Sequence, residues 1–479
     1  MIRGALAHHQ RSVFRSQRAI MRKLLIAIIA SAQLAGCAAR TAPPPSTLTR
    51  TPLTRWDGSA FSPLEYAPLW WRQFDDPVLD AIETAAIDAN RDVRSALARF
   101  DQARAVFDED RRRQYPTVTA GAFVDVRDQA QPGFRDEPLR ITTYRAAFDA
   151  SWELDFFGRV RAAVAAARAN AESFEADLSS VRVSVAADVA LNYFELRGIQ
   201  RQLSVLDRSL ANQRATLRLT EARRDAGIGG EQDVASASAR VSAIEADVPP
   251  LRTALAVREH RLAVLTGQAP GQLKVDLAPR AYPVLATSIA LGPPDQLLDR
   301  RPDVRAAERR LAAAAAREGV ATADLYPRIT ITGVLGLLAG RGNLFGAGDS
   351  RAWAVTPALQ WSAFDLGSAR ARLRGAHAAT DEALAGYEQT MLLALEETET
   401  ALVTYRQRQE RLVKLTDEVR ESARAAGIAR LRYREGVSEF LTLLDAERTQ
   451  LQAESSAAQA EADLFTAVVG LYRAVGGLK

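Results

Sequence analysis

The chain has 479 residues, of which 47% are apolar and 25% are charged, with 28 glycines, 20 prolines and one cysteine. This composition excludes collagen-like repeats and low-complexity disorder, and one cysteine excludes an internal disulfide scaffold. Four histidines leave little material for a His/Cys metal cage, whereas the formal charge of +4 invites a nucleic-acid or anionic-membrane partner.

Residues 1–36 have the organisation of a secretory leader. Met21-Arg22-Lys23 precedes an apolar run over 24–32 and then small residues, which is the order of a signal peptide with its cleavage zone. The apolar run is too short to cross a bilayer as a helix. Translation from Met21 is an alternative to Met1, because the first 20 residues are basic and have no apolar period.

Loss of this leader changes the charge of the chain. It contains no Asp or Glu, so its removal reduces Lys and Arg from 62 to 56 against 58 acids, a formal charge of −2. The remaining arginines alternate with acids along predicted helices and do not cluster. We therefore expect no nucleic-acid partner.

The leader ends in Leu34-Ala35-Gly36-Cys37, which resembles the processing box of bacterial lipoproteins. The resemblance implies that Cys37 is acylated and becomes the first residue of the mature chain, and Ala38 at the next position implies delivery to the outer membrane. An inert small residue in a cleaved leader is the alternative. Residues 37–55 are rich in Pro, Ser and Thr and predict an extended, lipidated tether.

The rest of the chain repeats itself at an offset of about 210 residues. The matches stay in chain order and include Asp92-Val93-Arg94 with Asp303-Val304-Arg305, Tyr115-Pro116 with Tyr326-Pro327, and Trp152 with Trp361. We predict an internal two-fold repeat, with a first repeat over 56–267, a linker over 268–300 and a second repeat over 301–479. Each repeat holds, in order, a helix, two strands and two long helices.

Each repeat contains a very long predicted helix. The first has no proline, and Leu196, Leu203 and Leu210 recur at the spacing of a coiled-coil seam. At ~1.5 Å per residue it is roughly 100 Å long. Pro249-Pro250 predict a kink or break in the helix that returns from it. The long helices and their antiparallel return helices are predicted over 158–226 with 232–266 and over 367–435 with 440–475.

Four segments that alternate with period 2 predict strands over about 117–127, 141–154, 328–338 and 352–364. In the second segment one face carries aromatic residues and the opposite face carries Arg145, Asp149, Ser151 and Glu153. These lengths fit transmembrane strands, although half-buried strands of a soluble sheet are the alternative. Because so few strands cannot close a barrel, a membrane barrel would have to be shared between chains.

Motifs spread over nearly all of the chain after Cys37 resemble, in content and order, the TolC-type outer-membrane efflux proteins and, more closely, their lipidated NodT- and OprM-like branch. They are Trp70-Trp71-Arg72-Gln73-Phe74, Ser151-Trp152-Glu153-Leu154-Asp155, Asp299-Arg300-Arg301-Pro302-Asp303-Val304, Gly436-Val437, Leu441-Thr442-Leu443-Leu444-Asp445 and Leu471-Tyr472-Arg473.

This resemblance implies a mainly helical homotrimer. Its chains would each add four strands to one shared twelve-stranded transmembrane β-barrel, continued by a long α-helical barrel through the periplasm, with residues 268–300 as an equatorial linker. It implies a channel, anchored in outer-membrane lipid, that passively conducts substrates expelled by an inner-membrane resistance-nodulation-division transporter through a periplasmic adaptor. No enzymatic activity, cofactor or metal is expected.

The resemblance also assigns roles to individual residues. A water-filled conduit needs a polar lumen, so the polar face of Arg145, Asp149, Ser151 and Glu153 is expected to line the barrel. The turns of the two helical hairpins are expected to be the periplasmic ends on which the adaptor docks, although glycines there also serve as ordinary helix caps. The expected docking residues are Arg224, Gly227, Gly230, Arg434, Gly436 and Ser438.

Asp233 and Asp445 match carboxylates that line the closed constriction in the family. Three copies of either would form an acidic ring that attracts cations and holds a gate. A favourable charge in the first turn of a helix is the alternative. The repeat equivalents of these two acids are Thr442 and Ser236, so whether the gate has one ring or two stays open.

Two other functions stay open from the sequence alone. One is the outer-membrane component of a type I protein secretion system, and the other is a non-channel periplasmic coiled-coil scaffold tethered by lipid. The residues do not identify the transported substrate, the pump, the adaptor or the need for lipidation.

The predicted processing site is directly testable. Cys37→Ser is expected to abolish metabolic labelling of the chain with palmitate, because no other thiol is available for acylation. Ala38→Ser, which places the same side chain at the neighbouring position, should retain the label. Labelling of the Cys37→Ser chain would refute this site.

Overall fold

The computed structural model describes residues 43–44, 46, 53–64, 69–131, 135–285 and 288–476. Cys37, the predicted leader and most of the predicted tether lie outside these residues. The chain divides into two compact units, which are described separately. The sheet unit contains Asp101–Ser173 and Glu308–Gly386, and the hairpin unit contains Leu48–Phe100, Phe174–Ala307 and Tyr387–Lys479.

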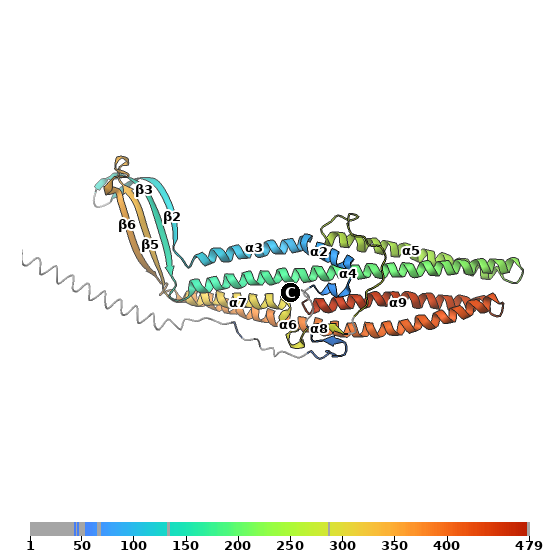
Figure 1. Ribbon diagram of the computed structural model, residues 1–479. Coiled ribbons are helices and arrows are strands. Elements are labelled where there is room, and N and C mark those ends of the chain that lie inside the picture. Colours follow the sequence, from blue (N-terminus) through green and yellow to red (C-terminus); the bar gives the residue numbers. More distant parts are fainter. Residues whose placement is uncertain are drawn as a thin grey trace, which may run out of the picture. The chain divides into compact units, whose positions relative to one another are not determined.

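The chain is mainly helical, with one large sheet of four strands (Figure 1). In chain order, the principal elements are β1 (Phe61–Ser62), η1 (Trp70–Phe74), α2 (Pro77–Ala89), α3 (Arg91–Arg112), β2 (Thr117–Gln131), β3 (Arg135–Leu154), α4 (Arg159–Asp225), α5 (Glu231–Leu265), β4 (Ile289–Ala290), α6 (Leu297–Arg300), α7 (Pro302–Ala323), β5 (Arg328–Ala339), β6 (Arg351–Gln360), α8 (Leu366–Arg434) and α9 (Phe440–Ala474).

The sheet unit is built on an antiparallel sheet with the strand order β2-β3-β5-β6. Its register places Phe148, Leu335 and Trp353 side by side on one face. The opposite face carries Ser151 between Thr117 and Thr332. The sheet is therefore apolar on one face and largely polar on the other.

The apolar face of this sheet is exposed. Phe148, Leu335 and Trp353 keep 59%, 65% and 77% of their surface accessible. A soluble sheet normally buries such a face against a core. The two outer strands, β2 and β6, each have a single neighbour among the described residues, so one edge of each is unpaired.

Some strand boundaries differ from the prediction. β2 runs past residue 127 and β3 begins before residue 141, because the antiparallel pairing of the two strands continues through Asp128 and Arg140. β6 stops at Gln360 and not at 364. There the Asp365 N–H donates to the Ser362 carbonyl at 2.9 Å, which turns the chain into α8.

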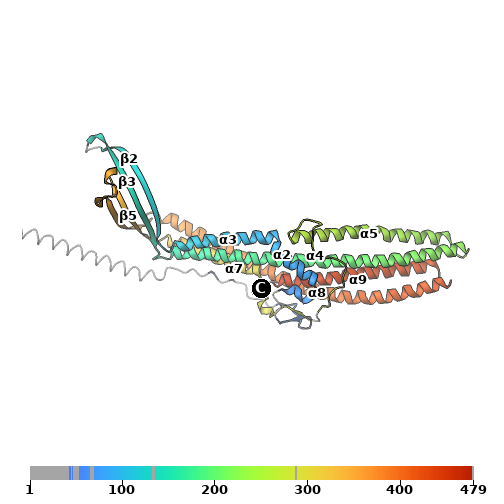
Figure 2. The ribbon, with the colours of Figure 1, turned by 45° about the horizontal axis from the view of Figure 1, so that its top comes forward.

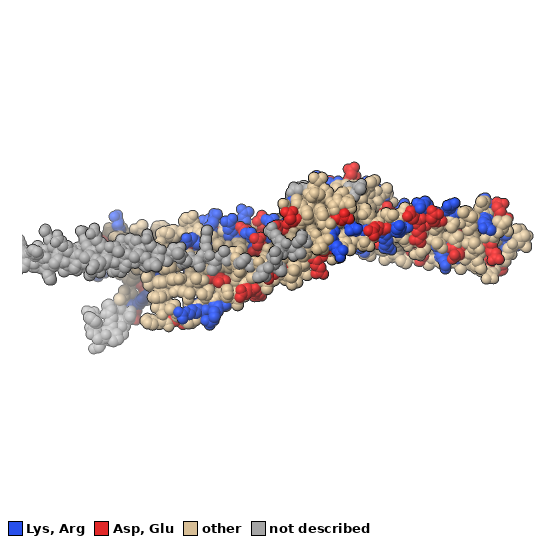
Figure 3. Space-filling view, turned by 90° about the horizontal axis from the view of Figure 1, so that it is seen from below, with Lys and Arg blue, Asp and Glu red and all other residues tan. Residues whose placement is uncertain are grey.

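The hairpin unit contains two long helical hairpins, in which α4 lies beside α5 and α8 beside α9 (Figures 1 and 2). Lys and Arg alternate with Asp and Glu along the helices seen in Figure 3. Of the predicted kink or break at Pro249-Pro250, the break is wrong, because α5 continues through both prolines, and the kink stays a prediction. Val248 and Leu251, which flank the prolines, pack against the buried cluster that includes Ile244, so tertiary packing compensates for the lost backbone donors.

An aromatic core fixes the middle of the hairpin unit. Trp70 stacks on Tyr472 with ring centroids 5.0 Å apart, and Phe74 meets Phe194 edge-on at 4.9 Å. The Tyr193 hydroxyl donates to Asp76, and burial raises the pKa of that hydroxyl. Residues of the N-terminal motif, Trp70 and Phe74, and of the C-terminal motif, Tyr472, therefore meet Phe194 of α4 in one core.

Arg301, from the Asp299-to-Val304 motif, joins three helices of the hairpin unit. Its buried guanidinium donates to the Ala474 carbonyl at 2.8 Å, which satisfies a free carbonyl at the end of α9. It also pairs with Asp303 at 2.7 Å and with Glu397 of α8 at 2.6 Å. Arg301 of this motif therefore has a structural role, because it connects these helices.

No helix among the described residues carries an apolar stretch of the length needed to cross a membrane.

Glu83 on α2 gives a pH-dependent prediction. It is fully buried, neither carboxylate oxygen has a hydrogen-bond partner in the described structure, and burial followed by the charge of Asp80 raises its pKa well above 4.5. The folded state therefore favours the protonated acid, and stability is lost as pH rises above the unfolded value. Glu83→Gln should match wild type near pH 4 and exceed its stability at pH 8 by on the order of 1 kcal/mol.

Thermal unfolding of the detergent-solubilised protein at both pH values measures this difference. Glu418→Gln, at an exposed position of α8, is the control and should show no pH-dependent difference from wild type. A constant difference between Glu83→Gln and wild type across this range would contradict the assignment.

Candidate functional site

The four polar residues predicted on one face of the second strand all lie on β3 and share its polar face. Arg145 pairs with Asp149, and its guanidinium lies 5.5 Å from the ring centroid of Phe123 on β2. Glu153 accepts from Arg159 Nε at 2.7 Å. The face thus carries alternating charges that are paired within the sheet unit.

The ends of the two helical hairpins have the same backbone geometry. Gly227 and Gly436 both have φ +74°, the left-handed conformation that favours glycine. The Ile228 N–H donates to the Arg223 carbonyl at 3.0 Å, and the Val437 N–H donates to the Arg432 carbonyl at 2.9 Å. Together with the hydrogen bonds that the Gly227 and Gly436 N–H groups donate to the Arg224 and Tyr433 carbonyls, these bonds form Schellman caps on α4 and α8.

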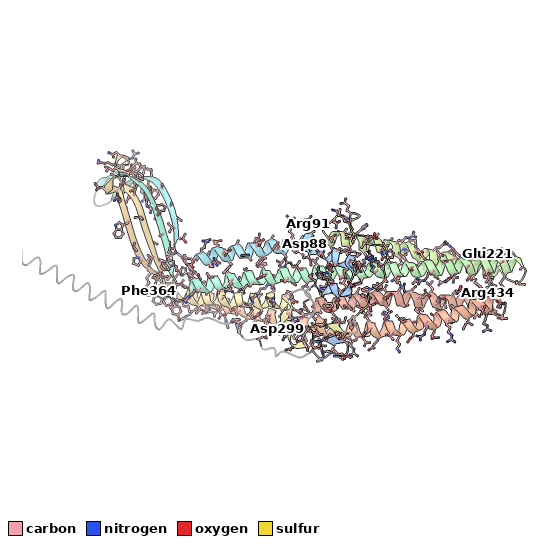
Figure 4. The ribbon with its side chains drawn as sticks, in the orientation of Figure 1. Asp88, Arg91, Glu221, Asp299, Phe364 and Arg434 are labelled. Atoms are coloured by element: carbon pink, nitrogen blue, oxygen red, sulfur yellow. The ribbon has the colours of Figure 1, made fainter. Side chains whose placement is uncertain are left out.

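The remaining predicted docking residues lie at the same ends. Arg224 contacts Asp225 at 2.8 Å and Glu231 at 3.4 Å, and hydrogen bonding to Asp225 raises its pKa further. Gly230 precedes α5 with extended backbone, φ −95°. Arg434 pairs with Glu435 at 3.5 Å, and the Ser438 hydroxyl donates to the Glu439 carbonyl at 3.4 Å. Figure 4 shows Arg434 at this end of α8.

Two apolar side chains lie within the turns expected to dock the adaptor but are not among the docking residues named from the sequence. Ile228 and Val437 directly follow the capping glycines and keep 64% and 63% of their surface exposed. A residue at this position often packs back on its own helix. Here both side chains project from the hairpin ends, so each end presents an apolar tip between charged residues.

A contact between the two hairpins was also missed. Arg223 Nη1 donates to the Tyr433 carbonyl at 2.8 Å, and its guanidinium lies 4.8 Å from the centroid of the Tyr433 ring. The Tyr433 hydroxyl reaches Thr220 Oγ1 at 3.4 Å, and Tyr433 itself is buried beside Phe440. These contacts tie the end of α4 to the end of α8. An arginine and a tyrosine just before the glycine turns were the available sequence signal.

The predicted gate acids lie just inside the hairpin ends on different helices. Asp233 is in the first turn of α5 and is half-buried. Asp445 on α9 is exposed and pairs with Arg448 at 2.9 Å. No hydrogen bond or ion pair connects either acid to the other hairpin in the described part of the chain.

Glu447, two residues beyond Asp445, is the carboxylate that the structure buries. It accepts from Arg430 at 2.8 Å and from Gln213 at 2.7 Å, and the Thr216 hydroxyl lies 3.2 Å away. The carboxylate thus joins α9 to α8 and α4. No feature of the sequence distinguishes Glu447 from the exposed glutamates near it in the chain.

The described residues contain no cluster of three or more His, Cys, Asp or Glu side chains that could hold a metal ion.

The family model described as outer membrane efflux protein matches residues 84–268 and 294–477. Nodulation protein T of Rhizobium leguminosarum is 29% identical over 382 residues, which cover 79% of this chain and 81% of that protein. Outer membrane protein OprJ of Pseudomonas aeruginosa is 31% identical over 405 residues, which cover 82% of this chain and 83% of OprJ. The solved outer-membrane channel OprN is 45% identical, with a TM-score of 0.86, over 91% of this chain and 99% of that chain.

The capping geometry predicts opposite effects for a glycine inside α8 and for the glycine that caps it. Gly436→Ala should destabilise the end of the α8–α9 hairpin by about 1–2 kcal/mol, because a Cβ is strained at its positive φ. Gly427→Ala, inside α8 with open space around it, should stabilise the helix by about 0.5–1 kcal/mol. Amide hydrogen exchange over residues 428–445 measures both. Equal exchange rates in the two variants would contradict the cap.

Proposed function

The chain belongs to the outer membrane efflux protein family, and on this basis we propose that it is the outer-membrane channel of a tripartite efflux system. It passively conducts substrates that an inner-membrane resistance-nodulation-division transporter expels through a periplasmic adaptor. Members of this family are channels and not enzymes. The observation that carries the proposal is a two-faced sheet with an exposed apolar face and two open edges.

The open edges support a homotrimer. Backbone groups at a sheet edge need partners inside a membrane, and only a closed barrel supplies them without a cover. Four strands per chain are too few to close, whereas three chains give a barrel of twelve. In this arrangement β6 of one chain pairs with β2 of the next.

The two faces of the sheet then meet different solvents. Phe148, Leu335 and Trp353 contact lipid, while the face with Arg145, Asp149, Ser151 and Glu153 lines a water-filled lumen. The paired charges on this face keep the lumen polar without a large net field. A non-channel scaffold would have no use for such an exposed apolar face.

Equal element lengths support the proposed two-fold repeat, with repeats over 56–267 and 301–479 joined by an equatorial linker. α3 and α7 each have 22 residues, and α5 and α9 each have 35. In the trimer the long hairpins of both repeats would form the helical barrel in the periplasm.

The hairpin ends are the proposed adaptor-docking site. Ile228 and Val437 offer exposed apolar tips, and Arg224 and Arg434 offer charge beside them. Gly227, Gly230, Gly436 and Ser438 shape the turns that present these side chains. Such tips fit the hairpin tips of a periplasmic adaptor.

Asp445 is the proposed gate acid. Its exposed carboxylate and its pairing with Arg448 suit a ring of ion pairs around the closed end, and Asp233, which is half-buried, is proposed for the same constriction.

Cys37, outside the described residues, is proposed as a lipid anchor in the outer membrane. Export of proteins by a type I system is less favoured, because two similar proteins of Pseudomonas putida are a pyoverdine export outer membrane protein, OpmQ, and a toluene efflux pump outer membrane protein, TtgC.

Conductance in planar bilayers tests the channel and its gate together. Purified full-length protein should form heat-modifiable trimers with discrete channel openings, and Asp445→Ala should raise the conductance of the closed channel severalfold by removing the ion pair with Arg448. Asp417→Ala, which removes an equivalent i,i+3 pair with Arg420 on α8, is the control. A monomer without conductance would contradict the channel, and unchanged conductance in Asp445→Ala would contradict the gate.

A further inference from the structure

The junctions where strands enter the long helices differ between the two halves of the sheet unit. At the start of α4 the arginines are paired with acids: Arg159 contacts Glu153 at 2.7 Å, and Arg161 contacts Asp155 at 3.0 Å. Asp155 also accepts from the Val160 N–H at 3.0 Å. The first junction is therefore neutralised within its own chain.

The second junction lacks these acids. At an offset of 209 residues, Phe364 stands in place of Asp155, and Arg370 corresponds to Arg161. One turn further, Arg374 stands in place of an alanine. Both arginines are exposed, and no acid pairs with either within the described residues. Asp365, the nearest carboxylate in the sequence, accepts from the Ser368 hydroxyl at 2.7 Å.

Exposed aromatic rings accompany these arginines. Phe364 is fully exposed, and Figure 4 shows it where the strands meet the helices of the sheet unit. Trp361, directly after β6, keeps 49% of its surface exposed while its indole N–H donates to the Leu325 carbonyl at 3.1 Å. The indole is thus held in place with its ring open to the surroundings. Trp361, Phe364, Arg370 and Arg374 together are called the α8 patch.

We propose that the α8 patch binds the anionic phospholipid headgroups of the leaflet that borders the helices. This inference rests on the proposed function, because the apolar sheet face just before the patch then lies in lipid. Aromatic side chains favour the boundary between hydrocarbon and headgroups. Arginine binds phosphate through paired hydrogen bonds, and i,i+4 spacing places Arg370 and Arg374 on one face of α8. An exposed phenylalanine beside two arginines without an acidic partner among the described residues suits this boundary, where the ring contacts hydrocarbon and the guanidinium groups contact phosphate.

Lipid titration of the full-length protein tests the patch. Detergent-solubilised protein is titrated with phosphatidylglycerol or with phosphatidylcholine, and native mass spectrometry counts the lipids bound. Arg370→Gln/Arg374→Gln should weaken phosphatidylglycerol binding about ten- to thirty-fold and leave phosphatidylcholine binding unchanged. Arg411→Gln/Arg420→Gln, which removes the same charge further along α8, should bind as wild type.

A second variant imitates the first half of the chain. Phe364→Asp places a carboxylate where Asp155 pairs with Arg161 in the first half, so it should also weaken phosphatidylglycerol binding without removing an arginine. Equal phosphatidylglycerol binding by wild type, Arg370→Gln/Arg374→Gln and Phe364→Asp would overturn the proposal. So would equal loss in the Arg411→Gln/Arg420→Gln control.

The same samples separate this proposal from the proposed function. Trimer mass and bilayer conductance report on the channel, whereas phosphatidylglycerol binding reports on the patch. A conducting trimer whose arginine variant binds lipid as wild type would refute the patch alone. Protein that neither trimerises nor conducts would refute the channel, and the headgroup selectivity would then still decide whether the patch binds lipid.

Discussion

Unsatisfied backbone hydrogen bonds at the edges of one sheet are the constraint on which the rest of this structure depends. β2 and β6 each have one free edge, and the sheet between them is apolar on one face and polar on the other. No packing within a single chain satisfies both features at once, since a cover for the apolar face leaves the edges open. In the proposed homotrimer, closure of the sheet with further copies in lipid would satisfy both.

The ends of the two hairpins combine turns that the backbone fixes with a few polar contacts between the hairpins. The glycine caps at Gly227 and Gly436 fix each turn through backbone hydrogen bonds, so the neighbouring Ile228 and Val437 side chains stay exposed. Between the hairpins, Arg223 and Tyr433 form a small clamp, and Glu447 forms a buried polar joint deeper in. In the proposed channel, opening at this end would separate these groups, and a few polar contacts part more readily than a continuous apolar seam.

The two halves of the chain preserve a backbone plan and diverge in charge. Trp152 and Trp361 both donate to a carbonyl at the preceding helix–strand turn, at 3.1 Å in each half. Beside them, however, the first half pairs Arg161 with Asp155, whereas the second half exposes Phe364 next to an unpaired arginine. Within the proposed repeat, the first junction is therefore neutralised by internal ion pairs, and the second is the one proposed to bind an external anion.

The sequence by itself determined what depends on near neighbours. Period-2 alternation identified the polar face of β3, and the glycine turns marked both hairpin ends, because these patterns reflect backbone geometry over a few residues. Only the tertiary structure showed that Arg223 meets Tyr433, that Glu447 is buried while Asp445 is exposed, and that α5 survives two prolines. Those outcomes depend on packing between segments some two hundred residues apart, which no local pattern records.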